Sequence, residues 1–395
     1  MYQITGARIL TPFEETTGAI IVREGQFEDI LPRPLENVPA IHADGLYVSP
    51  GFIDIHVHGG GGASPMTGKP EDVLTMCRAH ARMGTTSILP TTLAAPEDML
   101  MGALSAIGSA MKDKTLPCRI LGAHMEGPCL NPLQAGAQAP GALKLPSEIS
   151  LSKYLEVLPE IRMMGAAPEL HGGMALGDAL KERGIVASAA HTNATYYEME
   201  EALLHGYSDI THLYSACSGI IRKGGFRIPG VIEAGLNMDK YSIQVIGDGK
   251  HLPPALLTLI YRCRGAENII LITDGLEFAG VDMQEGAVYT QQNGVKALYE
   301  DGVMKLLDRS AFAGSASTMN VLIRNMHSAG IPLTDAVRMA TENPARRINA
   351  VGIGRIQKGY QADYVLFDSN INVCLTAVGG KVYRDDLMLS KELSA

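Results

Sequence analysis

The chain has 395 residues, of which 46% are hydrophobic and 19% charged, and its formal net charge is −9. This length suits one large domain with a smaller companion, and the acidic balance excludes nucleic acid and an anionic membrane as expected partners. The six cysteines form no C-x-x-C pair, and no run of about 18 apolar residues occurs. We therefore expect a cytoplasmic protein that binds a small molecule, and an anionic ligand would need a local cation.

Both ends of the chain carry short β-like runs separated by turn-rich segments. We expect residues 1–49 and 352–395 to pair into one small β-sandwich domain, which leaves residues 50–351 for a larger one. The runs that predict this domain are Arg8–Leu10, Ala19–Val22, Leu46–Val48, Ala362–Asp368, Val373–Val378 and Lys381–Tyr383.

Eight short apolar runs follow one another in the middle of the chain at intervals of roughly 20 to 40 residues, the repeat length of β-α units. Helical stretches fill the gaps, and Thr195 with Glu198 makes a capping-box pattern at the start of one. We predict an α/β protein with a (β/α)8 TIM-type barrel rather than an open doubly wound sheet. The runs are Gly51–His56, Thr86–Pro90, Arg119–His124, Met163–Ala167, Val186–His191, Asp209–His212, Ser242–Ile246 and Asn268–Thr273.

The alternation lapses after the eighth run. Asn293-Gly294 and Asp301-Gly302 are hairpin-turn pairs between alternating segments, so we expect a β-hairpin insertion at about residues 287–307. Two helical segments, Thr318–Ala329 and Thr334–Ile348, should follow it.

Barrel enzymes carry their reacting groups at the carboxyl ends of the strands. The predicted strand ends supply four histidines and two carboxylates. Imidazole and carboxylate ligands without thiolate favour a catalytic divalent ion, with zinc first and iron or manganese as alternatives, over a structural zinc site. Each residue alone could be a core histidine or a capping carboxylate, but the joint pattern indicates a centre for one or two ions. The candidate ligands are His56, His58, Glu126, His191, His212 and Asp274.

The sequence resembles the amidohydrolase superfamily and, within it, the N-acetylglucosamine-6-phosphate deacetylase family. The resemblance spans nearly the whole chain and rests on P-G-F-I-D-I-H-V-H-G at 50–59, H-M-E-G-P at 124–128, A-H-T-N-A at 190–194, T-H-L-Y at 211–214, G-D-G-K-H at 247–251, L-I-T-D at 271–274, A-G-S-A at 313–316 and K-G-Y-Q-A-D-Y-V at 358–365. It implies metal-dependent hydrolysis of N-acetylglucosamine 6-phosphate to glucosamine 6-phosphate and acetate.

The resemblance also implies roles for individual residues. Glu126, His191 and His212 would hold the main ion, while His56 and His58 would hold a second ion together with Glu126 and Asp274. Asp274 would act as general base and then as general acid. Arg227 and His251 would bind the phosphate of the substrate in a homodimer, to which Arg262 or Arg264 could contribute from a neighbouring subunit. The full set of expected substrate-binding residues is Ala137, Gln138, Ser215, Ala216, Arg227, His251, Ala313 and Gly314.

Three departures from the family pattern leave the sugar open. Gln138 replaces a histidine that would polarise the acetyl carbonyl, Ser215 replaces an asparagine, and the segment after Cys217 is longer and more basic, with Arg222 and Lys223 as alternative phosphate ligands. N-acetylgalactosamine 6-phosphate or another N-acyl amino sugar is therefore an alternative substrate. Cyclic-amide hydrolysis is disfavoured because no lysine occupies the expected strand end. A catalytically silent binding module is a further alternative.

Overall fold

The eight apolar runs form a parallel barrel in the computed structural model, which describes residues 1–394. The strands pair in chain order, and the short strand β10 (Arg119–Ile120) adds to β9. A parallel bridge between Val57 and Gly275 joins the two ends of the sheet. The predicted TIM-type barrel is therefore confirmed. Its strands are β8 (Phe52–Val57), β9 (Thr85–Thr92), β11 (Ala123–Glu126), β12 (Ile161–Ala166), β13 (Val186–Ala189), β14 (Tyr207–Ile210), β17 (Ser242–Val245) and β18 (Ile269–Leu271).

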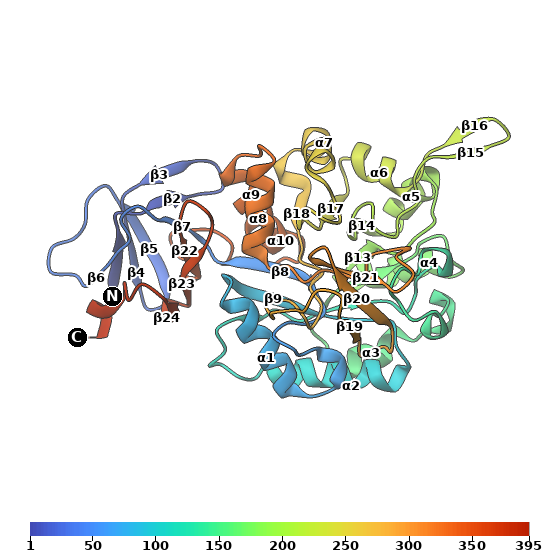
Figure 1. Ribbon diagram of the computed structural model, residues 1–395, viewed down its shortest axis with the longest axis horizontal. Helices are drawn as coiled ribbons and strands as arrows, with labels where there is room; N and C mark the ends of the chain where they lie inside the picture. The colour runs from blue at the N-terminus through green and yellow to red at the C-terminus, as the bar shows by residue number, and fades with distance from the viewer. Residues whose placement is uncertain (395) are drawn as a thin grey trace.

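Helices surround this barrel (Figure 1). Strands β8 and β9 are buried at every residue, as expected for parallel strands covered on both faces. Within residues 1–394 no helix has both the length and the apolar character that crossing a membrane requires. The first eight helices are α1 (Pro70–Ala81), α2 (Glu97–Ala110), α3 (Leu151–Val157), α4 (Gly173–Glu182), α5 (Tyr196–Leu204), α6 (Val231–Asn237), α7 (Pro254–Arg264) and α8 (Met319–Ser328), with short 3-10 turns at Pro65–Thr67, Pro132–Gln134, Pro140–Ala142, Pro146–Glu148 and Ala266–Asn268.

Two helix predictions had different outcomes. The capping box at the start of α5 is present: the Thr195 amide donates to Glu198 Oε2 at 2.7 Å, and the Glu198 amide donates to Thr195 Oγ1 at 3.3 Å. The single helix predicted at Thr334–Ile348 was wrong, because the segment forms α9 (Leu333–Met339) and α10 (Glu342–Arg347). Pro344 lacks the N–H that a continuous helix would need there, so the chain turns at Thr341 before helix formation resumes.

Both chain ends form the β-sandwich, which lies beside the barrel (Figure 1). The two sheets share one apolar core, to which Ile4, Ile20 and Phe27 contribute from the N-terminal part and Leu366 and Leu375 from the C-terminal part. The predicted sandwich is therefore confirmed. One sheet has the order β5 (Gln26–Leu31), β4 (Ala19–Arg23), β1 (Tyr2–Thr5), β6 (Ala40–His42); the other has β24 (Lys381–Asp385), β23 (Val373–Val378), β22 (Tyr364–Phe367), β7 (Tyr47–Pro50), β2 (Arg8–Leu10), β3 (Glu15–Thr17), and the turn Lys391–Ser394 follows.

Two small antiparallel sheets are added to the barrel. The flap comprises β19 (Val288–Thr290), β20 (Lys296–Glu300) and β21 (Val303–Leu306) and packs its apolar side against Leu276 and Ala313. The hairpin of β15 (Ile221–Lys223) and β16 (Phe226–Ile228) projects away from the barrel (Figure 1). It turns at Gly224-Gly225, whose φ angles of 56° and 87° suit the tight turns of two-residue hairpins. This hairpin was not predicted from the sequence.

Candidate functional site

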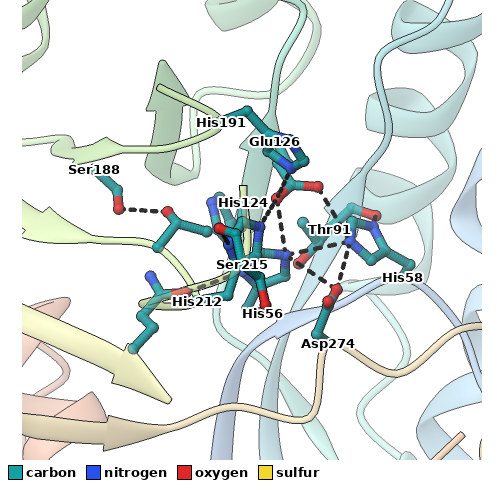
Figure 2. A network of polar contacts seen from close by, with 12 residues as sticks. His56, His58, Thr91, His124, Glu126, Ser188, His191, His212, Ser215 and Asp274 are labelled. Atoms are coloured by element: carbon teal, nitrogen blue, oxygen red, sulfur yellow. Dashed lines mark hydrogen bonds and ion pairs between the residues drawn. The ribbon is translucent and has the colours of Figure 1, made fainter. Parts of the chain in front are cut away.

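The six candidate metal ligands meet at the carboxyl end of the barrel, with Glu126 at their centre (Figure 2). Glu126 is the last residue of β11 and is 1% exposed. Its two carboxylate oxygens lie within reach of all four imidazoles, so this side chain of β11 connects its own strand end with those of β8, β13 and β14. The distances from the histidine Nε2 atoms to the nearest Glu126 oxygen are 3.4 Å for His56, 3.3 Å for His58, 3.3 Å for His191 and 3.0 Å for His212.

Two overlapping groups in this cluster have the spacing of metal ligands. One contains His56, His58 and Glu126, the other Glu126, His191 and His212, and within each group the ligand atoms lie within 4.8 Å of one another. Asp274 adds to the first group, since its Oδ1 lies 3.2 Å from His58 Nε2. The donor set of imidazole nitrogens and carboxylate oxygens fits a divalent ion such as zinc, iron or manganese.

The hydrogen bonds behind the four imidazoles aim their Nε2 atoms at Glu126. Each Nδ1 lies at hydrogen-bond distance from an oxygen, which an Nδ1–H satisfies, and the Nε2 lone pair then remains for a ligand. The acceptors are Gln244 Oε1 for His56 (3.0 Å) and the backbone carbonyls of Thr91 for His58 (3.3 Å), Gln134 for His191 (2.7 Å) and Ser215 for His212 (3.0 Å).

Three of the ligands lie on backbone in the left-handed region. The φ angles are 44° for His191, 29° for His212 and 47° for Asp274, a conformation that non-glycine residues rarely adopt. Each follows the end of a barrel strand, and the bend directs the side chain into the barrel mouth. Such strain persists where the surrounding structure imposes it, typically at functional sites.

Electrostatics keep the two carboxylates ionised. Burial raises the pKa of Glu126, but the nearby histidines, His56 and His191 foremost, lower it well below its usual range. Burial likewise opposes ionisation of Asp274, yet the hydrogen bond from His58 and the charges of the histidines lower its pKa to about 2. Conversely, burial lowers the pKa of His58, but Asp274 and Glu126 raise it to about 10. Without a metal ion, a proton on His58 partly balances the two negative charges.

A cavity of about 260 Å³ opens on this cluster. This volume is slightly below the range typical of ligand sites, about 300–1,000 Å³, so the cavity suits a small molecule. His56 and Arg227 are not part of its wall. The other predicted site residues line it: His58, Glu126, Ala137, Gln138, His191, His212, Ser215, Ala216, His251, Asp274, Ala313 and Gly314.

Gln138 is bonded to the metal-ligand cluster. Its Nε2 donates to Glu126 Oε2 at 2.5 Å, and its Oε1 accepts from the Ala94 amide at 2.8 Å. Both polar ends of this amide are therefore engaged by the protein. One of the two N–H donors that were expected to polarise an acetyl carbonyl is directed at Glu126.

His251 lies in the cavity wall and is fixed by Asp248. Its Nδ1 lies 2.7 Å from Asp248 Oδ2, and both side chains are nearly buried. The ring also packs edge-on against Phe312, with ring centroids 4.9 Å apart. Since Nδ1 is engaged, Nε2 is the nitrogen left for a ligand.

The arginines have different surroundings. Arg227 is exposed on β16, directly across the hairpin from Arg222. Arg264 is buried, donating to the Tyr241 carbonyl and pairing with Asp239 at 3.2 Å. The idea that Arg264 reaches a neighbouring phosphate was therefore wrong, because its guanidinium anchors the end of α7 to the loop before β17.

Some residues of the site were missed from the sequence. Gln291 and Phe312 bring the flap region into the cavity wall, and the turn pairs of the flap did not reveal which side chains would point there. Tyr214 also lines the cavity and stands in the quoted T-H-L-Y segment. Gln244 contacts His56 from β17, where it is a polar residue inside an apolar run, a signal that could have identified it.

Comparisons with known proteins show what this chain is similar to. The sequence profile of the amidohydrolase family matches residues 47–384. N-acetylglucosamine-6-phosphate deacetylase of Lysinibacillus sphaericus is 30% identical over 349 residues, which cover 88% of each chain. N-acetylgalactosamine-6-phosphate deacetylase of Escherichia coli O157:H7 is 31% identical over 356 residues, covering 89% of this chain and 91% of that protein.

Solved structures show the same similarity. N-acetylglucosamine-6-phosphate deacetylase from Pasteurella multocida superposes with a TM-score of 0.89 at 28% identity, over 97% of this chain and 100% of that one. A mutant of the enzyme from Mycobacterium smegmatis in complex with N-acetyl-D-glucosamine-6-phosphate has a TM-score of 0.88 at 27% identity, over 96% and 98% of the two chains. The resemblance stated from the sequence is confirmed.

Proposed function

Because the chain belongs to the amidohydrolase family, we propose that it hydrolyses the N-acetyl group of N-acetylglucosamine 6-phosphate to give glucosamine 6-phosphate and acetate. The observation that carries this proposal is the buried cluster of four imidazoles and two carboxylates opening on a small cavity. The similarity to deacetylases of this substrate over 88% of the chain supports the choice of amide.

The centre would hold one or two divalent ions, with zinc as the first choice. Glu126, His191 and His212 would hold the main ion, and His56 and His58 the second, together with Glu126 and Asp274. When bound, such an ion supplies a Lewis acid that polarises an amide carbonyl and lowers the pKa of water to about 7.

Asp274 would carry the proton. Because its pKa is lowered to about 2, it is a carboxylate at neutral pH and can accept a proton from the attacking water. The water oxygen adds to the carbonyl carbon, and the C–N bond then breaks. Asp274 delivers the proton to the leaving nitrogen, which would otherwise depart as a strongly basic amide anion.

The rest of the cavity wall would hold the sugar. Gln138 would also contact the acetyl group, because its Nε2 carries two N–H donors and only one of them is needed for the hydrogen bond to Glu126. Ser215 lies beside His212 and would contact the sugar hydroxyls. Ala137, Ala216, Ala313 and Gly314 would offer backbone groups. Gly314 has a φ of 84°, and a Cβ there would lie 3.0 Å from Leu276, so this close approach needs glycine.

His251 and Arg227 would bind the phosphate. His251 can do so within its own chain, whereas the exposed Arg227 lies outside the cavity wall. We therefore propose a cytoplasmic homodimer in which the hairpin of one copy reaches the cavity of the other. Exposed Ile221 and Phe226 on the hairpin support an interface, since an isolated two-stranded hairpin is at best marginally stable in water.

N-acetylgalactosamine 6-phosphate is the second candidate substrate. The 31% identity to a deacetylase of that compound favours it, as does Ser215 in place of asparagine. The silent binding module is disfavoured because all six ligands converge on one point.

Acetate release from the purified, zinc-loaded protein tests the proposal. We expect turnover of N-acetylglucosamine 6-phosphate to exceed that of its galactose epimer and of unphosphorylated N-acetylglucosamine. A higher rate on N-acetylgalactosamine 6-phosphate would make that compound the preferred substrate in place of N-acetylglucosamine 6-phosphate. If neither of the two sugar phosphates released acetate while at least one ion was bound per chain, the proposed function would be overturned.

A further inference from the structure

A buried polar network lies beneath the metal centre. Gln244 on β17 and Asp209 on β14 are both fully buried. Gln244 Oε1 lies 3.0 Å from His56 Nδ1, and Gln244 Nε2 donates to Asp209 Oδ2 at 2.7 Å. Ser188 and Ser242 also donate to Asp209, at 2.7 and 2.5 Å. The network therefore links a metal ligand to the interior of the barrel.

Asp209 fixes the orientation of the Gln244 amide. Because the carboxylate accepts hydrogen bonds, the N–H of Gln244 faces Asp209 and its carbonyl oxygen faces His56. An acceptor at that position requires the proton of the neutral imidazole to sit on Nδ1 of His56. The lone pair is then on Nε2, which lies 3.4 Å from Glu126 and 3.6 Å from Asp274.

His56 differs from the other three ligating histidines in the kind of acceptor behind it. The Nδ1 atoms of His58, His191 and His212 lie against backbone carbonyls, which every residue type supplies. His56 lies against a side chain. Its orientation therefore depends on the identity of one residue, and a substitution can change it without altering the backbone.

We propose that Gln244 is a positioning residue that sets how tightly His56 and His58 hold an ion, with Asp209 keeping Gln244 in the required orientation. The inference rests on the second ion of the proposed function. Removing the hydrogen-bond partner of a ligating histidine typically weakens metal binding by about 10- to 100-fold. The substitution leaves the backbone carbonyls that accept from His191 and His212 in place. The affinity for the main ion should therefore not change, and only the second ion should bind more weakly.

Zinc titration of the metal-free, full-length protein against a competing chelator tests this without any turnover. In Gln244→Met, a side chain of similar length lacks the amide oxygen, and we expect the affinity for the second ion to fall about 10- to 100-fold. The affinity for the first ion should not change. Ser188→Ala is the matched control, because it removes a donor to Asp209 but leaves the bond between Gln244 and His56.

A double variant tests the direction of the hydrogen bonds. Gln244→Glu combined with Asp209→Asn exchanges carboxylate and amide, so residue 244 still offers His56 an acceptor while residue 209 becomes the donor. We expect this pair to bind the second ion more tightly than Gln244→Met. A merely structural role for Gln244 would predict no such rescue.

Every outcome of these zinc titrations either supports or overturns the proposed role of Gln244. Unchanged binding of the second ion in Gln244→Met, or equal weakening of both ions, would overturn the role of Gln244. If Gln244→Met does not fold, the double variant decides, and loss of its second ion would overturn the proposal. A single ion in the unaltered protein would overturn it together with the two-ion centre, whereas failure of the deacetylase proposal would appear only in the acetate assay.

Discussion

The two ends of the proposed substrate site are built differently. At the proposed metal end, six side chains from five strand ends are at most 8% exposed and lie together around Glu126. At the phosphate end, His251 is enclosed, but Arg227 is exposed on a hairpin that projects from the barrel. The proposed metal end is thus complete within one chain, while the proposed phosphate end would lack its arginine unless a second copy supplied it. Four predictions, from the largest effect to the smallest, test this difference.

Glu126→Gln should have the largest effect, because Glu126 is the side chain common to both ligand groups. An amide carries no charge and offers a single acceptor oxygen, so we expect loss of both ions and of measurable acetate release. Metal analysis of the purified protein checks this. Glu156→Gln, an exposed carboxylate on α3, is the control, and full metal content in Glu126→Gln would contradict the assignment.

Asp274→Asn should abolish most turnover but leave the metal largely in place. Loss of a general acid and base typically lowers kcat by about 10²- to 10⁴-fold, while Glu126, His191 and His212 would still hold the main ion of the proposed centre. Steady-state kinetics together with metal analysis separates the two effects. Asp282→Asn, in an exposed loop, should behave like the unaltered enzyme; near-normal kcat in Asp274→Asn would refute the mechanism.

Arg227→Ala should raise KM for the phosphorylated substrate. A hydrogen bond to a charged group contributes about 1.5–3 kcal/mol, which corresponds to roughly 10- to 150-fold in KM. KM for unphosphorylated N-acetylglucosamine should not change. Arg222→Ala, directly across the hairpin, tests the neighbouring alternative, and an unaltered KM in Arg227→Ala would move the phosphate site elsewhere.

Metal binding at His56 and His58 should weaken as pH falls. The pKa of His58 is raised to about 10 in the metal-free protein, so at pH 7 a proton occupies the nitrogen that an ion needs. Because the pKa of His58 is raised, the proton competes with the metal ion for this nitrogen, and binding of the ion must release it. Each proton released on binding makes the metal affinity rise about tenfold per pH unit. Zinc titrations between pH 6 and 8 measure this slope for the second ion; a slope of zero would show that His58 binds no ion.

Much of the metal end could be predicted from the sequence. The apolar runs locate the barrel strands, and the residues at their carboxyl ends, such as His191 and His212, must meet at one rim once the barrel closes. Local signals also existed for two features that were missed. Gly224-Gly225 marks the turn of the projecting hairpin, and Pro344 marks the break between α9 and α10.

Contacts across the barrel could not be predicted in the same way. Gln244 and Asp209 stand in short strands where either face could point inward, and their pairing depends on strands 35 residues apart along the chain. The buried Arg264 and the exposed Arg227 likewise differ in surroundings rather than in residue type.

The sequence by itself determined the order of the strands and the chemical identity of the candidate ligands, because both follow from local patterns along the chain. Only the tertiary structure decided which nitrogen of each imidazole faces Glu126, that the Gln138 amide is engaged by Glu126, and that Arg227 lies outside the cavity of its own chain. The physical reason is that hydrogen-bond direction and burial depend on atoms brought together from distant segments, which exist as neighbours only once the barrel has closed.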